Sequence, residues 1–327
     1  MFSKKQKIIF WSLFGFVFIG LLLVATFFDL QISNLIASRW MVDGNYMSSN
    51  KFARFFEVVG EMPLYLFIMV ACAIIVSKCL EIKRTWLKVL LCVLFFGIGV
   101  GLGYYGGDKF WAYIYKLDKV KYLWFDDNIL LLIFTVVLSI VFEGLFVLLI
   151  SKKLKSHLNQ LLPLAVIVLI AALISNGIVQ GAKPFFARER YRAIYYLDYL
   201  KYTDHPGFTP WYVIGGSSSK IVATFPDELG VTSTFFSSFP SGHTCAAGIT
   251  YSLMFIPLFV DKFKNSKYSW VFITIGIFYT GLVAFTRILM GAHYLSDVLF
   301  GGTIVFLSNI IAYVIVKSYL KKKNINY

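Results

Sequence analysis

The stretch LLPLAVIVLIAALISNGIVQG, residues 161–181, carries no charged side chain and decides the fold. An α-helix needs about 20 apolar residues to cross the hydrocarbon core of a bilayer, and this stretch has that length. The whole chain has the same character, because 58% of its 327 residues are hydrophobic and only 15% are charged. Charged residues make up about a quarter of an ordinary soluble domain, and disordered chains are poor in apolar residues. The composition therefore excludes both classes.

Seven further apolar runs flank this stretch, and together they predict an all-α, polytopic membrane helical bundle of about eight transmembrane helices. The predicted spans are residues 8–28, 62–77, 86–105, 129–150, 161–181, 244–260, 269–285 and 294–316. The second and the sixth are short. The first run follows three lysines, but it is too long for the core of a signal peptide and no small-residue cleavage pattern follows it. We therefore expect a retained helix.

The net charge of +14 lies mainly in those segments between the predicted spans that would be on one side of the membrane. With the N-terminus in the cytoplasm, the inside segments are residues 1–7, 78–88, 151–160, 261–268 and 317–327. They contain 17 of the 31 Lys and Arg but only two of the 17 acids, so they carry +15 and the rest of the chain carries −1. Cytoplasmic segments of membrane proteins are enriched in Lys and Arg. We therefore expect a multi-pass cell-membrane protein with both termini in the cytoplasm and no nucleic-acid partner.

The outside connections are then residues 29–61, 106–128, 182–242 and 286–293. The third is by far the longest, and connections of that length are usually functional. The four cysteines form no C-x-x-C pair, so the sequence indicates neither a zinc site nor a redox motif. His157 in an inside segment and His205 in the longest connection have no partner that the sequence identifies.

Four of the seven arginines lie at outside membrane boundaries, against the positive-inside bias. They are Arg188, Arg190, Arg192 and Arg287. The planar guanidinium group suits phosphate. For Arg188 and Arg192, an interaction with lipid headgroups is an open alternative.

The predicted topology places three segments together on the outside face: residues 183–190, 239–244 and 286–297. In the second, Ser241 is a good N-cap for the helix that follows, and Gly242 lets a ligand approach the backbone. The free N–H groups of a helix N-terminus bind anions. His243 lies in the first turn of that helix and is expected to point at the bound group.

The third segment places His293 and Asp297 four residues apart, on one helix face. A carboxylate there can hold the proton of one ring nitrogen and leave the other nitrogen as a nucleophile. Lys183, Arg190 and Arg287 would repel a divalent metal. The charge balance therefore favours a bound phosphate, and we expect no metal site.

These segments resemble the three signatures of the type-2 phosphatidic acid phosphatase superfamily, the group of lipid phosphate phosphatases and vanadium haloperoxidases. The matching residues are Lys183-x6-Arg190, Pro240-Ser-Gly-His243 and Arg287-x5-His293-x3-Asp297. Two positions depart from the family pattern. Tyr191 replaces the usual proline after the first arginine, and Thr286 replaces the usual serine before the third-signature arginine.

The resemblance implies that His293 attacks phosphorus and forms a phosphohistidine, while Asp297 orients it. His243 would protonate the leaving alcohol and then activate water. The implied phosphate-binding residues are Lys183, Arg190, Ser241, Gly242 and Arg287. No metal or organic cofactor is implied. Residues 86–327 would form a phosphatase core of six helices with the extracytoplasmic loop 182–242, and residues 1–85 a two-helix extension.

The implied partner is a membrane lipid phosphate in the bilayer: phosphatidylglycerophosphate, phosphatidate or polyprenyl diphosphate. The oligomeric state is left open. The alternative is a transporter or channel with an anion-binding site, for which Glu143 within the fourth apolar run is the best support. An intramembrane serine protease using Ser241 is disfavoured, because no G-x-S-x-G motif is present.

Overall fold

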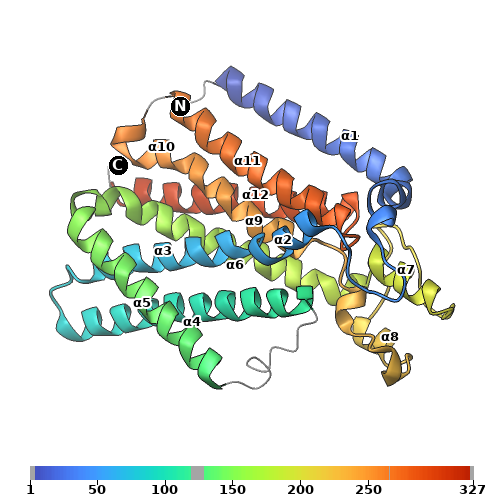
Figure 1. Ribbon diagram of the computed structural model, residues 1–327. Coiled ribbons are helices and arrows are strands. Elements are labelled where there is room, and N and C mark those ends of the chain that lie inside the picture. The colour runs from blue at the N-terminus through green and yellow to red at the C-terminus, as the bar shows by residue number, and fades with distance from the viewer. Residues whose placement is uncertain (1–3, 119–128, 265, 325–327) are drawn as a thin grey trace. The chain divides into compact units, whose positions relative to one another are not determined.

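The computed structural model describes residues 4–118, 129–264 and 266–324. Over these ranges the regular elements are helices, and the only β pairing is an isolated bridge between Val42 and Asn45. The predicted all-α fold class is confirmed (Figure 1). Part of the predicted connection 106–128 lies outside the described residues, and its first part belongs to a long helix.

Seven long helices match seven of the predicted spans. They are α1 (Lys4–Ala37), α3 (Met62–Cys79), α4 (Thr85–Asp118), α5 (Ile129–Lys153), α6 (Leu158–Phe186), α11 (Ser266–Leu289) and α12 (Leu295–Lys322). The shorter helices are α2 (Lys51–Val59), α7 (Tyr191–Tyr199), α8 (Ser218–Val222), α9 (Gly242–Ala247) and α10 (Ile256–Phe259). Within the described part of the chain, seven helical segments are long and apolar enough to cross a bilayer. The protein is therefore a multi-pass membrane protein.

The predicted sixth span, residues 244–260, differs from the other seven predicted spans. It is helical but divided into α9, the 3-10 helix η5 (Gly248–Phe255) and α10. A methyl group at Gly248 would lie 2.1 Å from Val305 Cγ1, so the segment packs too closely for a larger residue there. Thr250 Oγ1 also donates to the Ala247 carbonyl (2.8 Å). Glycine and such local side-chain bonds disfavour a continuous α-helix.

The described chain forms two compact units. The first contains Met1–Glu57, Ser175–Cys245 and Thr280–Ile304, and the second contains Val58–Ile174, Ala246–Tyr279 and Val305–Tyr327. All three motif segments belong to the first unit. The boundary predicted at residue 85 stays a prediction.

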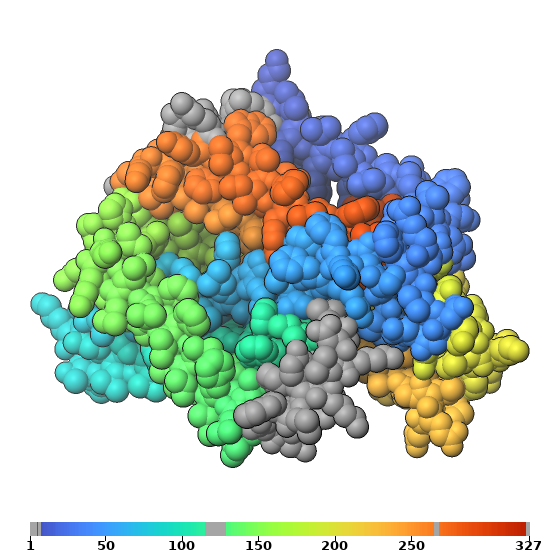
Figure 2. Space-filling view, in the orientation of Figure 1, coloured from blue at the N-terminus to red at the C-terminus, as the bar shows by residue number. Residues whose placement is uncertain are grey.

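In the first unit, the N-terminal segment contacts the long connection 182–242. In Figure 2 the blue surface of the N-terminal segment adjoins the yellow surface of the long connection, and Tyr195 donates a hydrogen bond to Asp43 Oδ1 (2.9 Å). Trp211 of the connection donates to Thr26 of α1 (3.0 Å). Buried Phe236 and Leu197 give the connection an apolar core of its own. The longest connection is therefore folded onto the N-terminal segment.

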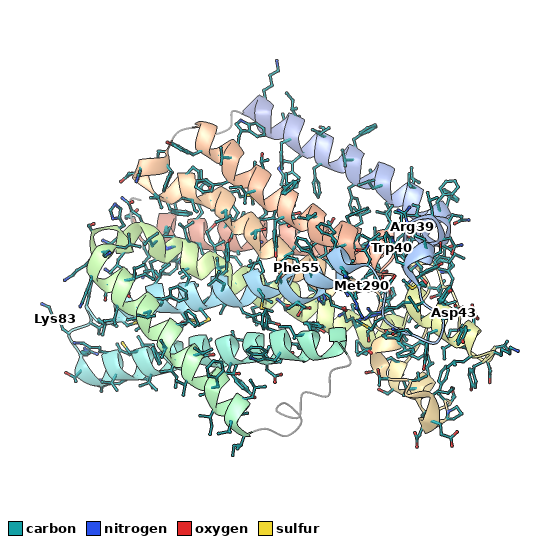
Figure 3. The ribbon with its side chains drawn as sticks, viewed as in Figure 1. Arg39, Trp40, Asp43, Phe55, Lys83 and Met290 are labelled. Atoms are coloured by element: carbon teal, nitrogen blue, oxygen red, sulfur yellow. The ribbon has the colours of Figure 1, made fainter. Side chains whose placement is uncertain are left out.

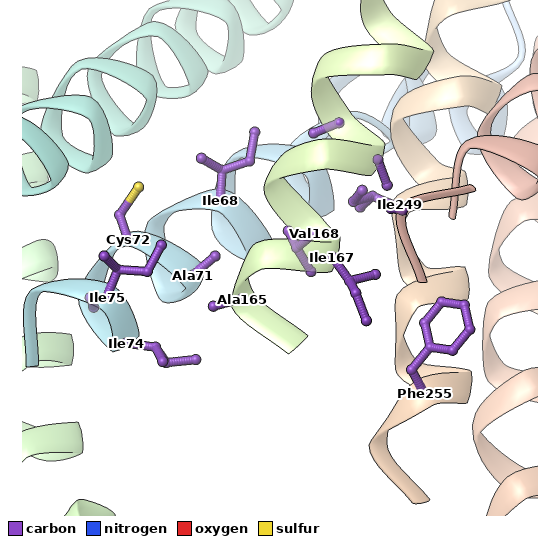
Figure 4. Close-up of a cluster of buried hydrophobic side chains, with 14 of the residues drawn as sticks. Ile68, Ala71, Cys72, Ile74, Ile75, Ala165, Ile167, Val168, Ile249 and Phe255 are labelled. Atoms are coloured by element: carbon purple, nitrogen blue, oxygen red, sulfur yellow. The ribbon is translucent and has the colours of Figure 1, made fainter. Parts of the chain in front are cut away.

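The second unit is built around buried apolar side chains of α3, α6 and η5. Figure 4 shows Ile68 and Cys72 of α3 with Ile167 of α6 and Phe255 of η5. Small residues such as Ala165 lie fully inside this cluster. Small side chains let membrane helices approach closely, which is how such helices gain packing energy.

A glycine ladder joins α4 to α5 in the same unit. Every fourth residue of α4 from Gly99 to Gly107 is a glycine. A methyl group at Gly99 would lie 2.4 Å from Glu143 Cδ, and one at Gly107 would lie 2.5 Å from Thr135 Cγ2. Neither carboxyl oxygen of Glu143 has a hydrogen-bond partner within the described ranges. Gly99 therefore leaves the space that the carboxyl group of Glu143 fills.

Replacement of Gly107 by Ala should destabilise the protein, because the β-branched side chain of Thr135 cannot move aside. Overpacking of this kind costs about 1–3 kcal/mol. The measurement is the thermal unfolding midpoint in detergent. Gly101→Ala on the same helix is the matched control, since nothing lies within 4 Å of its added methyl group. Equal midpoints for the two variants would contradict the packing.

Candidate functional site

Backbone hydrogen bonds join the three motif segments within the first unit. The bonds run from Ser238 N–H to the Arg188 carbonyl (3.0 Å), from Arg192 N–H to the Gly291 carbonyl (2.8 Å) and from Ser241 N–H to the Asp297 carbonyl (3.0 Å). Ser238 directly precedes the second segment and Arg192 lies two residues after the first, so each segment contacts the other two itself or through a nearby residue. The sequence places them together only by topology, and the structure brings them into direct contact.

Two glycines make these contacts possible. Gly291 has a φ of 63°, and a methyl group there would lie 3.3 Å from the Arg192 nitrogen. A methyl group at Gly242 would lie 3.0 Å from Lys183 Nζ, which places the lysine against the start of α9. Larger residues would push the segments apart.

Ser241 is the N-cap of α9, as predicted. Its Oγ accepts hydrogen bonds from the backbone N–H (3.4 Å) and the hydroxyl (3.0 Å) of Thr244. The Ser241 side chain is fully buried. The serine therefore fixes the first turn that carries Gly242 and His243.

His293 is buried and held in one orientation. Its Nδ1 lies 2.6 Å from the Ser238 carbonyl oxygen, and a carbonyl only accepts, so Nδ1 carries the proton. The lone pair is then on Nε2, the nitrogen free to act as a nucleophile. Asp297 Oδ2 lies 3.7 Å from Nδ1, beyond hydrogen-bond distance. The Ser238 carbonyl therefore takes the position that the sequence predicts for Asp297.

Burial, together with the nearby Arg190 and Arg287, lowers the pKa of His293 well below its usual value and outweighs the attraction of Asp297. The ring is therefore neutral at pH 7. A histidine must be neutral to attack an electrophile. The environment thus favours the nucleophilic form.

Asp297 organises the residues around His293. It accepts hydrogen bonds from Ser238 Oγ (2.5 Å), the Tyr294 N–H (2.8 Å) and Arg188 Nη1 (2.6 Å). Ser238 is thus held by Asp297 at its side chain and holds His293 with its carbonyl. Asp297 acts on the histidine through this serine.

Arg188 is buried, with 1% of its surface exposed, which excludes the lipid-headgroup alternative for it. Besides Asp297, it donates to Asp29 Oδ2 (3.0 Å), Ser296 Oγ (2.7 Å) and the Thr209 carbonyl (2.7 Å). Ser296 also donates its N–H to Asp29 (3.0 Å). Asp29 is not among the predicted site residues, because its only sequence signal is an acid at the end of the first apolar run.

Three further arginines form a cation cluster, which we define as Arg190, Arg192 and Arg287. Arg190 lies close enough to the other two for mutual repulsion. The Nε of each has no hydrogen-bond partner within the part of the chain that the structure describes. Arg192 is buried, so the lipid-headgroup alternative is excluded for it as well. The cluster offers several guanidinium donors to an anion.

Apolar packing fixes one side of this cluster. Arg287 Nη1 lies 3.9 Å from Met290 Sδ. Met290 belongs to a buried apolar cluster against which Trp40 packs, and Figure 3 labels both residues in the same region. The arginine therefore lies beside an apolar cluster.

His243 and the cation cluster both contact Glu57 of α2, which the sequence analysis did not identify. His243 Nε2 lies 3.1 Å from the Glu57 carbonyl oxygen, so Nε2 is the donor. Glu57 Oε1 lies 3.4 Å from Arg192 Nη1 and 3.3 Å from Arg287 Nη2.

Among the described residues, no group of three or more His, Cys, Asp or Glu could hold a metal ion.

His205 has partners that the sequence does not reveal. Its Nδ1 lies 3.0 Å from Glu189 Oε2, and its Nε2 lies 3.2 Å from Asp198 Oδ1. Burial opposes a charge on the ring, but the hydrogen bonds to both carboxylates outweigh it and raise the pKa of His205. His205 therefore ties α7 to the motif segment that contains Glu189.

Replacement of His205 by Asn should lower the unfolding midpoint more at about pH 5.5 than at about pH 9. Because the folded-state pKa is raised, the charged ring stabilises the fold below the pKa of the unfolded chain. That contribution is lost as the pH rises through the folded-state pKa. Thermal unfolding across pH checks this, with the exposed His157→Asn as the control. An equal loss at both pH values would contradict the charged interaction.

Comparison with known families agrees with this geometry. The model of the PAP2 superfamily matches residues 129–321, which is more than half of the chain. No curated protein and no solved structure matches the chain. The matched range contains the three motif segments, while Asp29 and Glu57 precede it. The chain therefore belongs to the PAP2 superfamily.

Proposed function

We propose that the protein is a metal-independent phosphatase that hydrolyses a membrane lipid phosphate through a phosphohistidine on His293. Membership in the PAP2 superfamily supports a phosphatase-type function, a phosphoester hydrolase, in a membrane protein. One observation carries the finer proposal. The Ser238 carbonyl holds the Nδ1 proton of His293, so the lone pair is on Nε2, and Arg190 and Arg287 lie within electrostatic range of the ring.

In the first step, His293 Nε2 attacks phosphorus and the bond between phosphorus and the leaving oxygen breaks. The protonated His243 donates its Nε2 proton to that oxygen, which departs as an alcohol and leaves the His243 ring neutral. The charge on the phosphoryl oxygens spreads in the transition state. Arg190, Arg287 and Lys183 stabilise it, together with the Gly242 N–H at the start of α9.

In the second step, the neutral His243 takes a proton from water, and the resulting hydroxide attacks phosphorus. The phosphorus–nitrogen bond breaks and His293 returns to its starting form with inorganic phosphate as the product. Asp297 keeps Ser238, and through it the imidazole, in place during both steps. No step requires a metal or an organic cofactor.

The proposed substrate is an amphiphile whose phosphate reaches the membrane boundary. The motif segments lie at the ends of apolar helices, and the distribution of Lys and Arg supports an extracytoplasmic site with both termini in the cytoplasm. Phosphatidylglycerophosphate, phosphatidate and polyprenyl diphosphate fit this description. A panel of these lipids, scored by phosphate release, distinguishes them.

A transporter or channel is the second candidate, and Glu143 is its support. This carboxyl lies in the second unit against the glycine ladder, whereas both histidines and the cation cluster lie in the first. A transport site would need the cations but not a histidine held in one tautomer. The geometry of His293 therefore favours the phosphatase.

Replacement of His293 by Ala should lower phosphate release from a lipid phosphate by about a thousandfold or more, because no other group can form the covalent intermediate. Wild-type release should persist with EDTA present. The measurement is inorganic phosphate released by purified protein in detergent. His157→Ala is the control, since that exposed side chain lies outside the first unit. Wild-type turnover in His293→Ala, or its abolition by EDTA, would contradict the mechanism.

A further inference from the structure

The carboxylate of Glu57 lies at the cation cluster, two members of which, Arg190 and Arg287, are proposed to hold the phosphoryl group. Its side chain is 5% exposed, and Oε1 contacts Arg192 (3.4 Å) and Arg287 (3.3 Å). Arg190 also lies within electrostatic range. Glu57 comes from α2, which precedes the residues that the family model matches. An acidic side chain of the chain itself thus lies where an anionic substrate would bind.

The contacts of Glu57 are longer than those of a close ion-pair network in the same unit. Arg188 lies 2.6 Å from Asp297 and 3.0 Å from Asp29. Charge-assisted hydrogen bonds are typically about 2.7–2.9 Å long, and both Glu57 contacts are longer. Glu57 Oε2 is buried without a hydrogen-bond partner among the described residues. The Glu57 contacts are therefore loose, whereas the Arg188 network is tight.

The donors of the cluster also exceed what one carboxylate can use. The Nε groups of Arg190, Arg192 and Arg287 are all without an acceptor in the described part of the chain. A phosphoryl group presents three strong acceptor oxygens at tetrahedral angles, whereas Glu57 presents two in one plane. The cluster therefore suits a larger anion than the one it holds.

The backbone of Glu57 engages the acid of the proposed reaction at the same time. His243 donates its Nε2 proton to the Glu57 carbonyl (3.1 Å). The same proton is the one that the leaving oxygen would receive. Glu57 therefore fills the anion site with its carboxylate and accepts the hydrogen bond of the proposed proton donor with its carbonyl.

We propose that Glu57 is an internal competitor of the substrate phosphate, so that a phosphoryl group binds only by displacing the Glu57 carboxylate from Arg192 and Arg287. Identifying the displaced anion with the substrate rests on the proposed function; the competition for an anion does not. Glu57 thereby weakens the binding of phosphate monoanions and dianions alike. It also returns to the cluster after turnover and so favours release of inorganic phosphate.

A purely structural Glu57 leads to the opposite expectation. If its charge were needed only to position Arg192 and Arg287, removing the charge would let the two arginines repel each other and leave the site. Phosphate would then bind more weakly. A variant without the charge therefore distinguishes the two roles: its phosphate affinity rises if Glu57 competes and falls if Glu57 only positions the arginines.

The experiment titrates inorganic phosphate into the purified full-length chain in detergent by isothermal calorimetry. Glu57→Gln keeps the shape and removes the charge, and should bind phosphate about tenfold tighter, because a like charge within a few ångströms is gone. Its KM for a lipid phosphate should fall in parallel. Glu61→Gln, four residues further on, is the matched control and should bind as wild type does. Equal or weaker phosphate binding by Glu57→Gln overturns the proposal.

A second variant covers the outcome that Glu57→Gln does not fold. Glu57→Asp keeps the charge but shortens the side chain by one methylene, which withdraws it from contacts that are already 3.3 and 3.4 Å long. It should also bind phosphate more tightly than wild type, and a larger rise of the unfolding midpoint with added phosphate is the independent readout. Unchanged or weaker binding by this variant overturns the proposal as well.

The two proposals fail in different ways. Tighter phosphate binding by the Glu57 variants without phosphate release from any lipid would remove the phosphatase and leave the internal competitor. Phosphate release by wild type with unaltered phosphate binding in the variants would remove the competitor and leave the phosphatase.

Discussion

The hydrogen bond from His293 Nδ1 to the Ser238 carbonyl fixes which ring nitrogen of His293 carries the lone pair, and the other contacts of the site maintain it. Ser238 is held by its N–H on the Arg188 carbonyl and by its hydroxyl on Asp297. Arg188 in turn pairs with Asp297 and Asp29. One histidine tautomer thus depends on residues from three separate parts of the sequence.

Burying these charges is tolerated only because each is paired. Arg188 lies between two carboxylates, and losing one partner of a buried pair typically costs about 3–5 kcal/mol. Asp29 belongs to α1, so the N-terminal segment completes this network and is more than an addition to the superfamily core. The same segment supplies Glu57 to the cation cluster. The N-terminal segment therefore contributes directly to the site.

The sequence predicts those features that depend on residue spacing along the chain or on the length of an apolar run. Seven long helices follow from such patterns. The predicted shared helix face of His293 and Asp297 is wrong, because α12 begins at Leu295 and His293 lies in the bend before it, although the two side chains are 3.7 Å apart. The Ser238 contact could not be predicted, because a backbone carbonyl has no side-chain signature. The position of Glu57 could not be predicted either, because its contact with Arg287 joins residues that are 230 positions apart in the sequence. The divided segment 244–260 depends on the packing of Gly248 against Val305, which no local pattern reveals.

Covalent catalysis by His293 can be tested by trapping the phosphorylated intermediate. The purified chain would be mixed with a lipid phosphate labelled in its phosphate group, quenched in base within one turnover, digested and analysed by mass spectrometry. The account predicts a phosphoryl group on His293 that survives base and is lost in acid. Label on a serine, an aspartate or His243, or turnover without any phosphohistidine at His293, would contradict it.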